Sequence, residues 1–115
     1  MEIHTEPFDV AFTIVTLVGR LDITGALQID RKFSVIAGSE KKILVDMSQV
    51  GYIASIGIRI LLTGAKTAKL KKGKMVFFNL QPNVENVLKT TGLLEVLPNF
   101  QNFKEACDAL ANAEN

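Results

Sequence analysis

The sequence predicts a single α/β domain, a sandwich in which a mixed sheet of four or five strands is covered by helices. Three observations lead to this fold class. Strand-like and helix-like hydrophobic patterns alternate along most of the chain. Residues 42–47 and 75–79 are short, nearly continuous apolar runs, which is typical of strands buried on both faces. A long segment with helical spacing separates these runs, and that order places helices over a sheet.

Two strands are expected at the start of the chain. Residues 3–8 form a weak strand pattern, and residues 12–21 form a strong one that is rich in β-branched side chains. Only a short connection at Asp9 and Val10 separates the two patterns. Such a spacing favours a hairpin. The sheet is therefore expected to begin with two sequential, paired strands.

The first helix is expected directly after this hairpin. Asp22 or Thr24 would cap it, because a side-chain oxygen at that position accepts a hydrogen bond from the first helical turn. Gly38 is expected to end the helix. The inward-facing stripe is predicted to consist of Ala26, Leu27, Ile29 and Phe33.

The middle of the chain predicts a buried strand, a short loop, a long helix and a second buried strand. The first strand covers residues 42–47, and the helix begins at Ser55 and runs to about Lys72, with Gly73 as its C-cap. The second strand covers residues 75–79. The stripe of the helix that faces the sheet is predicted to be Ile58, Leu61, Leu62, Ala65 and Ala68.

The last third of the chain predicts two helices with a short strand between them. Pro82 opens the first helix and Gly92 closes it. Residues 94–97 are interpreted as the short strand, and residues 112–115 as a frayed tail. The apolar residues at helical spacing are Val84, Val87 and Leu88 in the first helix, and Phe103, Ala106, Cys107 and Leu110 in the second.

Length and composition are consistent with one globular domain over residues 1–115. A chain of this size buries about two-thirds of its unfolded surface, which is enough for one core. Its 48% hydrophobic and 22% charged residues are ordinary values for such a domain. We expect a cytoplasmic protein, because neither a signal peptide nor an apolar stretch of about 20 residues is evident.

Charge and residue types exclude several classes of function. The net charge of +1 argues against general attraction to nucleic acid. One histidine, His4, and one cysteine, Cys107, make a metal cluster or a nucleophile–base pair untenable, and Cys107 is expected to be a buried spectator. We therefore expect no enzyme, no metal and no cofactor. The one concentration of charge is interpreted as a solvated helix face: Lys66, Lys69, Lys71, Lys72 and Lys74.

Ser55 is the most informative residue. It stands where the central helix begins, so its hydroxyl is expected to point outward beside the unpaired N–H groups of the first turn. A phosphate at that place would meet these donors and the positive end of the helix dipole. Position alone favours a simple N-cap role for Ser55, since serine is a preferred cap.

Three segments resemble the anti-sigma factor antagonists of the STAS domain family. Residues 45–48 (Val-Asp-Met-Ser) and 54–57 (Ala-Ser-Ile-Gly) are similar to the family's strand end and phosphorylation segment. Residues 18–22 (Val-Gly-Arg-Leu-Asp) are similar to its Gly-x-Leu-Asp strand end. The sequence departs from the family pattern at Ala54, where an acid is usual, and at Ile56, where a small polar residue is usual.

The resemblance implies a STAS-like fold and a regulatory binding function. Its phosphoacceptor would be Ser55, and its partners an anti-sigma factor or related serine protein kinase and a phosphatase. We expect no direct nucleic-acid contact and no membrane insertion. The residues expected to bind the partner are Asp22, Ile56, Gly57, Arg59 and Ile60.

Ile56 and Ile60 are expected on the outer face of the central helix, opposite the sheet-facing stripe, where they would form a docking surface. Alternatively, a neighbouring helix covers them, or they are scattered surface residues. A phosphate on Ser55 would stabilise the helix start rather than melt it. Phosphorylation would therefore act at the interface, by adding a charge of about −2 that must be desolvated.

Two other functions remain open. The chain could be a non-phosphorylated STAS interaction subunit of a larger assembly, such as a transporter complex, and the missing acid at Ala54 favours that alternative. A phosphoacceptor that resembles a response regulator would use Asp46 at a strand end. That scheme needs an acidic cluster after the first strand and a lysine near the last one, and Asp22 is the only acid found.

Overall fold

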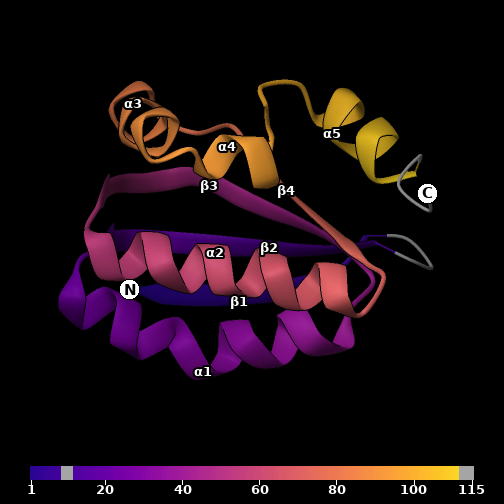
Figure 1. Cartoon of the computed structure of the whole chain (residues 1–115), viewed down its shortest axis with the longest axis horizontal. Coiled ribbons are helices and arrows are strands. Elements are labelled where there is room, and N and C mark those ends of the chain that lie inside the picture. The colour runs from indigo at the N-terminus through magenta and orange to yellow at the C-terminus, as the bar shows by residue number, and fades with distance from the viewer. Residues whose placement is uncertain (9–11, 112–115) are drawn as a thin grey trace.

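The computed structural model describes residues 1–8 and 12–111, and a five-stranded sheet lies at its centre (Figure 1). The strands are β1 (Glu2–Pro7), β2 (Phe12–Leu21), β3 (Lys42–Ile53), β4 (Lys74–Phe78) and β5 (Asn99–Phe100). The helices are α1 (Ile23–Ser39), α2 (Ser55–Leu70), α3 (Pro82–Thr91), α4 (Leu93–Val96) and α5 (Phe103–Ala111). The expected turn at Asp9 and Val10 and the expected frayed tail at residues 112–115 lie outside the described residues.

The sheet is mixed, as the sequence predicts. Its strand order is β1-β2-β3-β4-β5. β1 pairs with β2 in the antiparallel sense, and the other three pairings are parallel. The carboxyl ends of β2 and β3 therefore meet at one edge of the sheet, and α1 and α2 both begin there (Figure 1).

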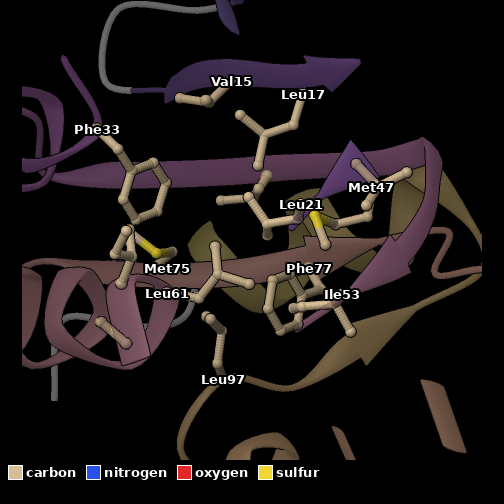
Figure 2. Close-up of a cluster of buried hydrophobic side chains, with 14 of the residues drawn as sticks. Val15, Leu17, Leu21, Phe33, Met47, Ile53, Leu61, Met75, Phe77 and Leu97 are labelled. Carbon is tan, nitrogen blue, oxygen red and sulfur yellow. The ribbon is translucent and has the colours of Figure 1, made fainter. Parts of the chain in front are cut away.

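The hydrophobic core has two parts on opposite faces of the sheet. The larger part lies between the sheet and the helices α1 and α2, and buried residues of α3 and α4 extend it. Figure 2 shows Leu21, Leu61 and Phe77 among its members. The smaller part lies under α5, where Leu44 and Val76 of the sheet form a cluster with residues of that helix. No helix in the described part of the chain is both long and apolar enough to cross a membrane.

Strand β3 is longer than expected. The sequence predicts a strand that ends at Met47 and a loop before Ser55, but β3 continues to Ile53. The prediction is wrong because β2 pairs with this second half through two register shifts. At the first shift, Oδ1 of Asp46 accepts a hydrogen bond of 3.0 Å from the N–H of Ser48. Such bulges place extra residues in one strand without ending its pairing.

The other edge of β3 is held by side chains from the region where α3 begins. β4 ends opposite Asp46, so it cannot pair with the second half of β3. Instead, Nε2 of Gln81 donates to the carbonyl oxygen of Ser48 at 2.9 Å. Nδ2 of Asn83 donates to the carbonyl oxygen of Gly51 at 2.7 Å. These two bonds hold the segment that leads to Ser55.

Helix α1 differs from the prediction in its end and in one residue of its stripe. It passes Gly38 and ends at Ser39, and the N–H of Glu40 still donates to Ile36 O at 2.9 Å. Asp22 is its N-cap, as expected. Ala26, Ile29 and Phe33 are buried as predicted, but Leu27 is 62% exposed.

The end of α2 also differs from the prediction. The helix ends at Leu70, and the left-handed residue after it is Lys72, with φ of 62°, rather than Gly73. Gly73 is required for space, because a β-carbon there would lie 2.3 Å from the carbonyl oxygen of Lys41. Of the predicted sheet-facing stripe, Leu61, Ala65 and Ala68 are buried, whereas Ile58 and Leu62 are only half-buried.

The predicted strand at residues 94–97 is wrong, because the short helix α4 occupies this place. Leu93 and Leu97 are both buried, and the N–H of Leu97 donates to Leu93 O at 2.9 Å, which is helical spacing. The short last strand is β5. Pro82 and Gly92 bound α3 as predicted, but Val87 is 40% exposed, and in α5 Cys107 is half-buried rather than buried.

Candidate functional site

The starts of α1 and α2 are brought together by the end of the sheet. Leu21, the last residue of β2, pairs with Ile53, the last residue of β3. The N–H of Ala54 then donates to the carbonyl oxygen of Leu21 at 2.9 Å. Asp22 and Ser55 follow these residues directly, so both helix starts lie at one edge of the molecule (Figure 1).

Ser55 is exposed and is the first residue of α2. The N-cap is Ala54, so the prediction that Ser55 caps the helix is wrong by one position. Ala54 has no side chain that accepts from the first turn, and within residues 1–8 and 12–111 no side chain caps α2. The N–H groups of Ser55, Ile56 and Gly57 are therefore left without an intrahelical or capping acceptor. An anion attached to Ser55 would find donors and a positive dipole end there.

Helix α1, in contrast, has a side-chain cap. Oδ1 of Asp22 accepts a hydrogen bond of 2.8 Å from the N–H of Gly25. This bond, helped by Arg20, holds the pKa of Asp22 below its ordinary value. Nε of Arg20 lies 3.5 Å from Oδ2 of Asp22, and its guanidinium lies 4.2 Å from the centre of the Tyr52 ring. Asp22 thus caps α1 and pairs with Arg20, and both interactions lie beside the start of α2.

Ile56 and Ile60 do not form the exposed outer stripe that the sequence predicts. Ile60 is only 8% exposed and Ile56 is half-buried, because α1 packs along this side of α2. The alternative in which a neighbouring helix covers the pair is therefore correct for Ile60. Gly57 is buried, and Arg59 is exposed.

An open groove with a volume of about 210 Å³ lies between α1 and α2. Its lining residues are Asp30, Ile56, Arg59, Ile60 and Thr63. It therefore begins one residue after Ser55 and carries one carboxylate and one guanidinium. Of the predicted partner-binding residues, the structure brings Ile56, Arg59 and Ile60 together here, while Asp22 and Gly57 lie at the helix starts.

Two exposed apolar residues of α1 were not predicted as part of the site. Ile23 is 65% exposed and Leu27 is 62% exposed. They lie seven and three residues before Asp30, so they share the side of α1 that faces the groove. We call Ile23, Leu27, Ile56 and Arg59 the α1–α2 surface. The spacing of four residues between Ile23 and Leu27 indicates that both lie on one side of the helix, but the sequence prediction assigned Leu27 to the inward stripe.

Candidate metal ligands and the alternative phosphoacceptor Asp46 can be placed within the described residues. Among residues 1–8 and 12–111, no group of three or more His, Cys, Asp or Glu side chains could hold a metal ion. Asp46, the phosphoacceptor of the alternative scheme, is half-buried in β3 and accepts the N–H of Ser48. Asp46 therefore has a structural role at the bulge.

Comparison with known proteins gives a family model and several relatives. The model of the STAS domain matches residues 3–106. The chain is 29% identical over 97 residues to BtrV of Bordetella bronchiseptica, a proposed anti-sigma factor antagonist, and the match covers 84% of this chain and 83% of that protein.

Solved structures show the same fold. An anti-sigma factor antagonist from Mycobacterium paratuberculosis superposes with a TM-score of 0.83 at 20% identity, over 96% of this chain and 94% of that one. SpoIIAA in its unphosphorylated form gives a TM-score of 0.78 at 22% identity, over 99% and 100% of the two chains. The phosphorylated form of Bacillus SpoIIAA gives 0.70 at 21% identity, over 93% and 97%.

Proposed function

Because the chain belongs to the STAS domain family, we propose that it is an anti-sigma factor antagonist that binds an anti-sigma factor or related serine kinase. Phosphorylation of Ser55 releases this partner, and a phosphatase restores binding. One observation carries the proposal. Ser55 is exposed at a helix start without a capping side chain, directly beside the α1–α2 surface.

The phosphate would leave the fold intact. The N–H groups of Ser55, Ile56 and Gly57 are available to its oxygens, and the α2 dipole favours a negative charge. Arg59 lies four residues further along α2, one turn away and exposed, so its guanidinium can pair with the phosphate. Both effects stabilise α2, so release must come from the interface and not from unfolding.

The free energy that weakens partner binding on phosphorylation comes from the interface. Ile23 and Leu27 present apolar side chains that a partner would bury. A phosphate of charge about −2 beside them would have to be desolvated on binding, at a cost of several kcal/mol. Since each 1.4 kcal/mol is about tenfold in affinity, partner binding would fall by at least about a hundredfold.

Histidine-kinase-like serine kinases of the source genome are the candidate partners, and calorimetry with each of them tests the proposal. The wild type and Ser55→Ala should bind one such kinase, and ATP should release the wild type with the addition of one phosphate. Ser55→Ala should bind without release. Ser55→Asp should bind about tenfold or more weakly at an unchanged Tm.

Asn86→Asp is the matched control, because it adds the same charge at an exposed position of α3. It should bind as the wild type does, which separates the local effect from net charge. Equal affinity of the wild type and Ser55→Asp would contradict the switch. Phosphate transfer to a residue other than Ser55 would contradict the assignment of the phosphoacceptor.

A further inference from the structure

Lysines gather at the end of the molecule where α2 ends and β4 begins. We call Lys41, Lys42, Lys66, Lys69, Lys71, Lys72 and Lys74 the lysine pole. No Asp or Glu occurs in the sequence between Asp46 and Glu85, so the whole α2–β4 segment lacks a compensating charge. The chain has 13 Lys and Arg, and the six outside the pole are outnumbered by its 12 Asp and Glu. The net charge of +1 therefore hides a strong separation of charge.

The fold brings two separate segments into this pole. Lys42 pairs with Lys74 across β3 and β4. The N–H of Lys74 donates to Lys41 O at 2.7 Å, and Nζ of Lys41 donates to Lys71 O at 2.8 Å. The run at residues 66–74, interpreted from sequence as one solvated helix face, is thus extended by the start of β3.

Leu70, the last residue of α2, lies within the sequence run of the lysine pole. Its side chain is 83% exposed, more than any other large hydrophobic residue in the described chain. Lys69 and Lys71 flank it, and both are exposed. An exposed leucine at a helix end, flanked by two exposed lysines, belongs to neither the core nor an ordinary solvated helix face.

We propose that the lysine pole binds the surface of an anionic lipid bilayer. The ammonium groups would lie among the negatively charged headgroups, and Leu70 would reach the boundary with the acyl chains. A lysine near such a surface contributes about fivefold to affinity. Binding would be peripheral and sensitive to salt, because the charges remain solvated and are screened.

A bilayer fits this surface better than a nucleic acid does. None of the seven residues is an arginine, whose planar fork binds phosphate in a bidentate manner. Single-stranded nucleic acids also stack on exposed aromatic rings. The segment 63–76 contains none, and Phe12, whose ring centre lies 5.7 Å from Nζ of Lys42, is half-buried. An exposed leucine gains nothing from a phosphate backbone, but it gains apolar burial in a bilayer.

Vesicle sedimentation with the full chain tests the proposal. The protein should bind vesicles of phosphatidylcholine and phosphatidylglycerol in roughly equal parts at low salt, and lose this binding at high salt. It should not bind vesicles of phosphatidylcholine alone. Absence of binding to the anionic vesicles at low salt would overturn the proposal.

Two charge-matched triple variants separate the pole from net charge. Lys66→Gln with Lys69→Gln and Lys71→Gln should weaken binding to anionic vesicles by at least about tenfold. Lys32→Gln with Lys89→Gln and Lys104→Gln changes the net charge equally at exposed sites elsewhere. This control should bind nearly as the wild type does, and an equal loss in both variants would overturn the proposal.

The role of Leu70 is tested by Leu70→Gln, which should weaken vesicle binding severalfold without lowering the Tm. Val87→Gln, at a 40% exposed apolar position of α3, is the control and should bind as the wild type does. A fluorescent DNA duplex serves as the competing ligand. Tighter binding to the duplex than to the anionic vesicles, lost in the Lys66, Lys69 and Lys71 variant, would assign the pole to nucleic acid and overturn the proposal.

Discussion

Gly57 of α2 lies directly against Leu21, the last residue of β2. A β-carbon on Gly57 would lie 2.6 Å from Cγ of Leu21 and 3.0 Å from its carbonyl oxygen. Leu21 is fully buried and belongs to the same core cluster as Leu61 and Phe77 (Figure 2). The contact therefore fixes the first turn of α2 to the sheet, and with it the position of Ser55.

We expect Gly57→Ala to destabilise the protein by about 1–3 kcal/mol, because the added methyl group must displace a buried side chain or the helix. Gly51→Ala is the control, since its β-carbon would meet nothing closer than 3.5 Å. Urea unfolding measures both variants. A Gly57→Ala variant as stable as Gly51→Ala would show that the first turn of α2 is loosely held.

Ile60 is expected to stabilise the fold as a core residue and not to contact the partner. Because it is 8% exposed, Ile60→Ala should lower the free energy of unfolding by about 2–5 kcal/mol. Leu70→Ala, at an 83% exposed position of the same helix, should change it by less than about 0.5 kcal/mol. Denaturant titration measures the free energy of unfolding of both variants. Equal values would show that the side chain of Ile60 does not contribute to the core.

The α1–α2 surface is expected to bind the partner through Leu27. Leu27→Lys should weaken partner binding by about tenfold or more, because a desolvated lysine replaces a buried apolar contact. Val35→Lys is a matched control, because both residues are 62% exposed and lie on α1. At about 100° per residue, Val35 lies about 140° around the helix from Asp30 and so points away from the groove, whereas Leu27 lies about 60° from Asp30. Calorimetry at equal Tm decides, and an unchanged affinity for Leu27→Lys would exclude this surface.

The cap of α1 predicts a dependence of stability on pH. The hydrogen bond from the Gly25 N–H and the nearby Arg20 lower the pKa of Asp22 below the ordinary 3.8, so its ionised form favours the folded state. That contribution is complete above pH 3.8 and is lost as the pH falls through the lowered pKa.

Asp22→Ala should therefore lower the Tm at neutral pH, and the difference from the wild type should narrow on acidification. Asp108→Ala removes a carboxylate of α5 that is 61% exposed and should change the Tm little. Thermal scans at several pH values measure both variants. A difference for Asp22→Ala that stays constant into strong acid would show that the cap does not depend on charge.

Most elements could be predicted from the sequence, because their hydrophobic periods are local. The second half of β3 could not, since residues 48–53 contain Ser48 and Gly51 and no continuous apolar run. These residues are extended because β2 pairs with them through bulges and because Gln81 and Asn83 bind their carbonyl groups. Both causes are tertiary interactions, and neither produces a recognisable pattern in the sequence of residues 48–53.

The position of Ser55 was predictable, whereas its surroundings were only partly so. The start of a helix can be predicted from the local sequence pattern. The structure confirms that Ser55 is exposed at the start of α2. The side of α2 that α1 covers depends on how two helices pack, and for this reason Ile60 was placed outside and Leu27 inside. Helical spacing alone gives the stripes of a helix, but not which neighbour each stripe meets.

Helix α2 connects the proposed partner surface to the proposed bilayer surface, and we expect the two to act independently. Ser55 and Leu70 are the first and last of its 16 residues, and at a rise of about 1.5 Å per residue they lie about 22 Å apart along the helix axis. This length is about three Debye lengths at physiological ionic strength, so a charge gained at one end is screened at the other. Substitutions at the two ends of α2 should then change the free energy of unfolding additively. The same rigid helix would hold Ser55 away from a bilayer bound at Leu70 and leave it open to a kinase in solution.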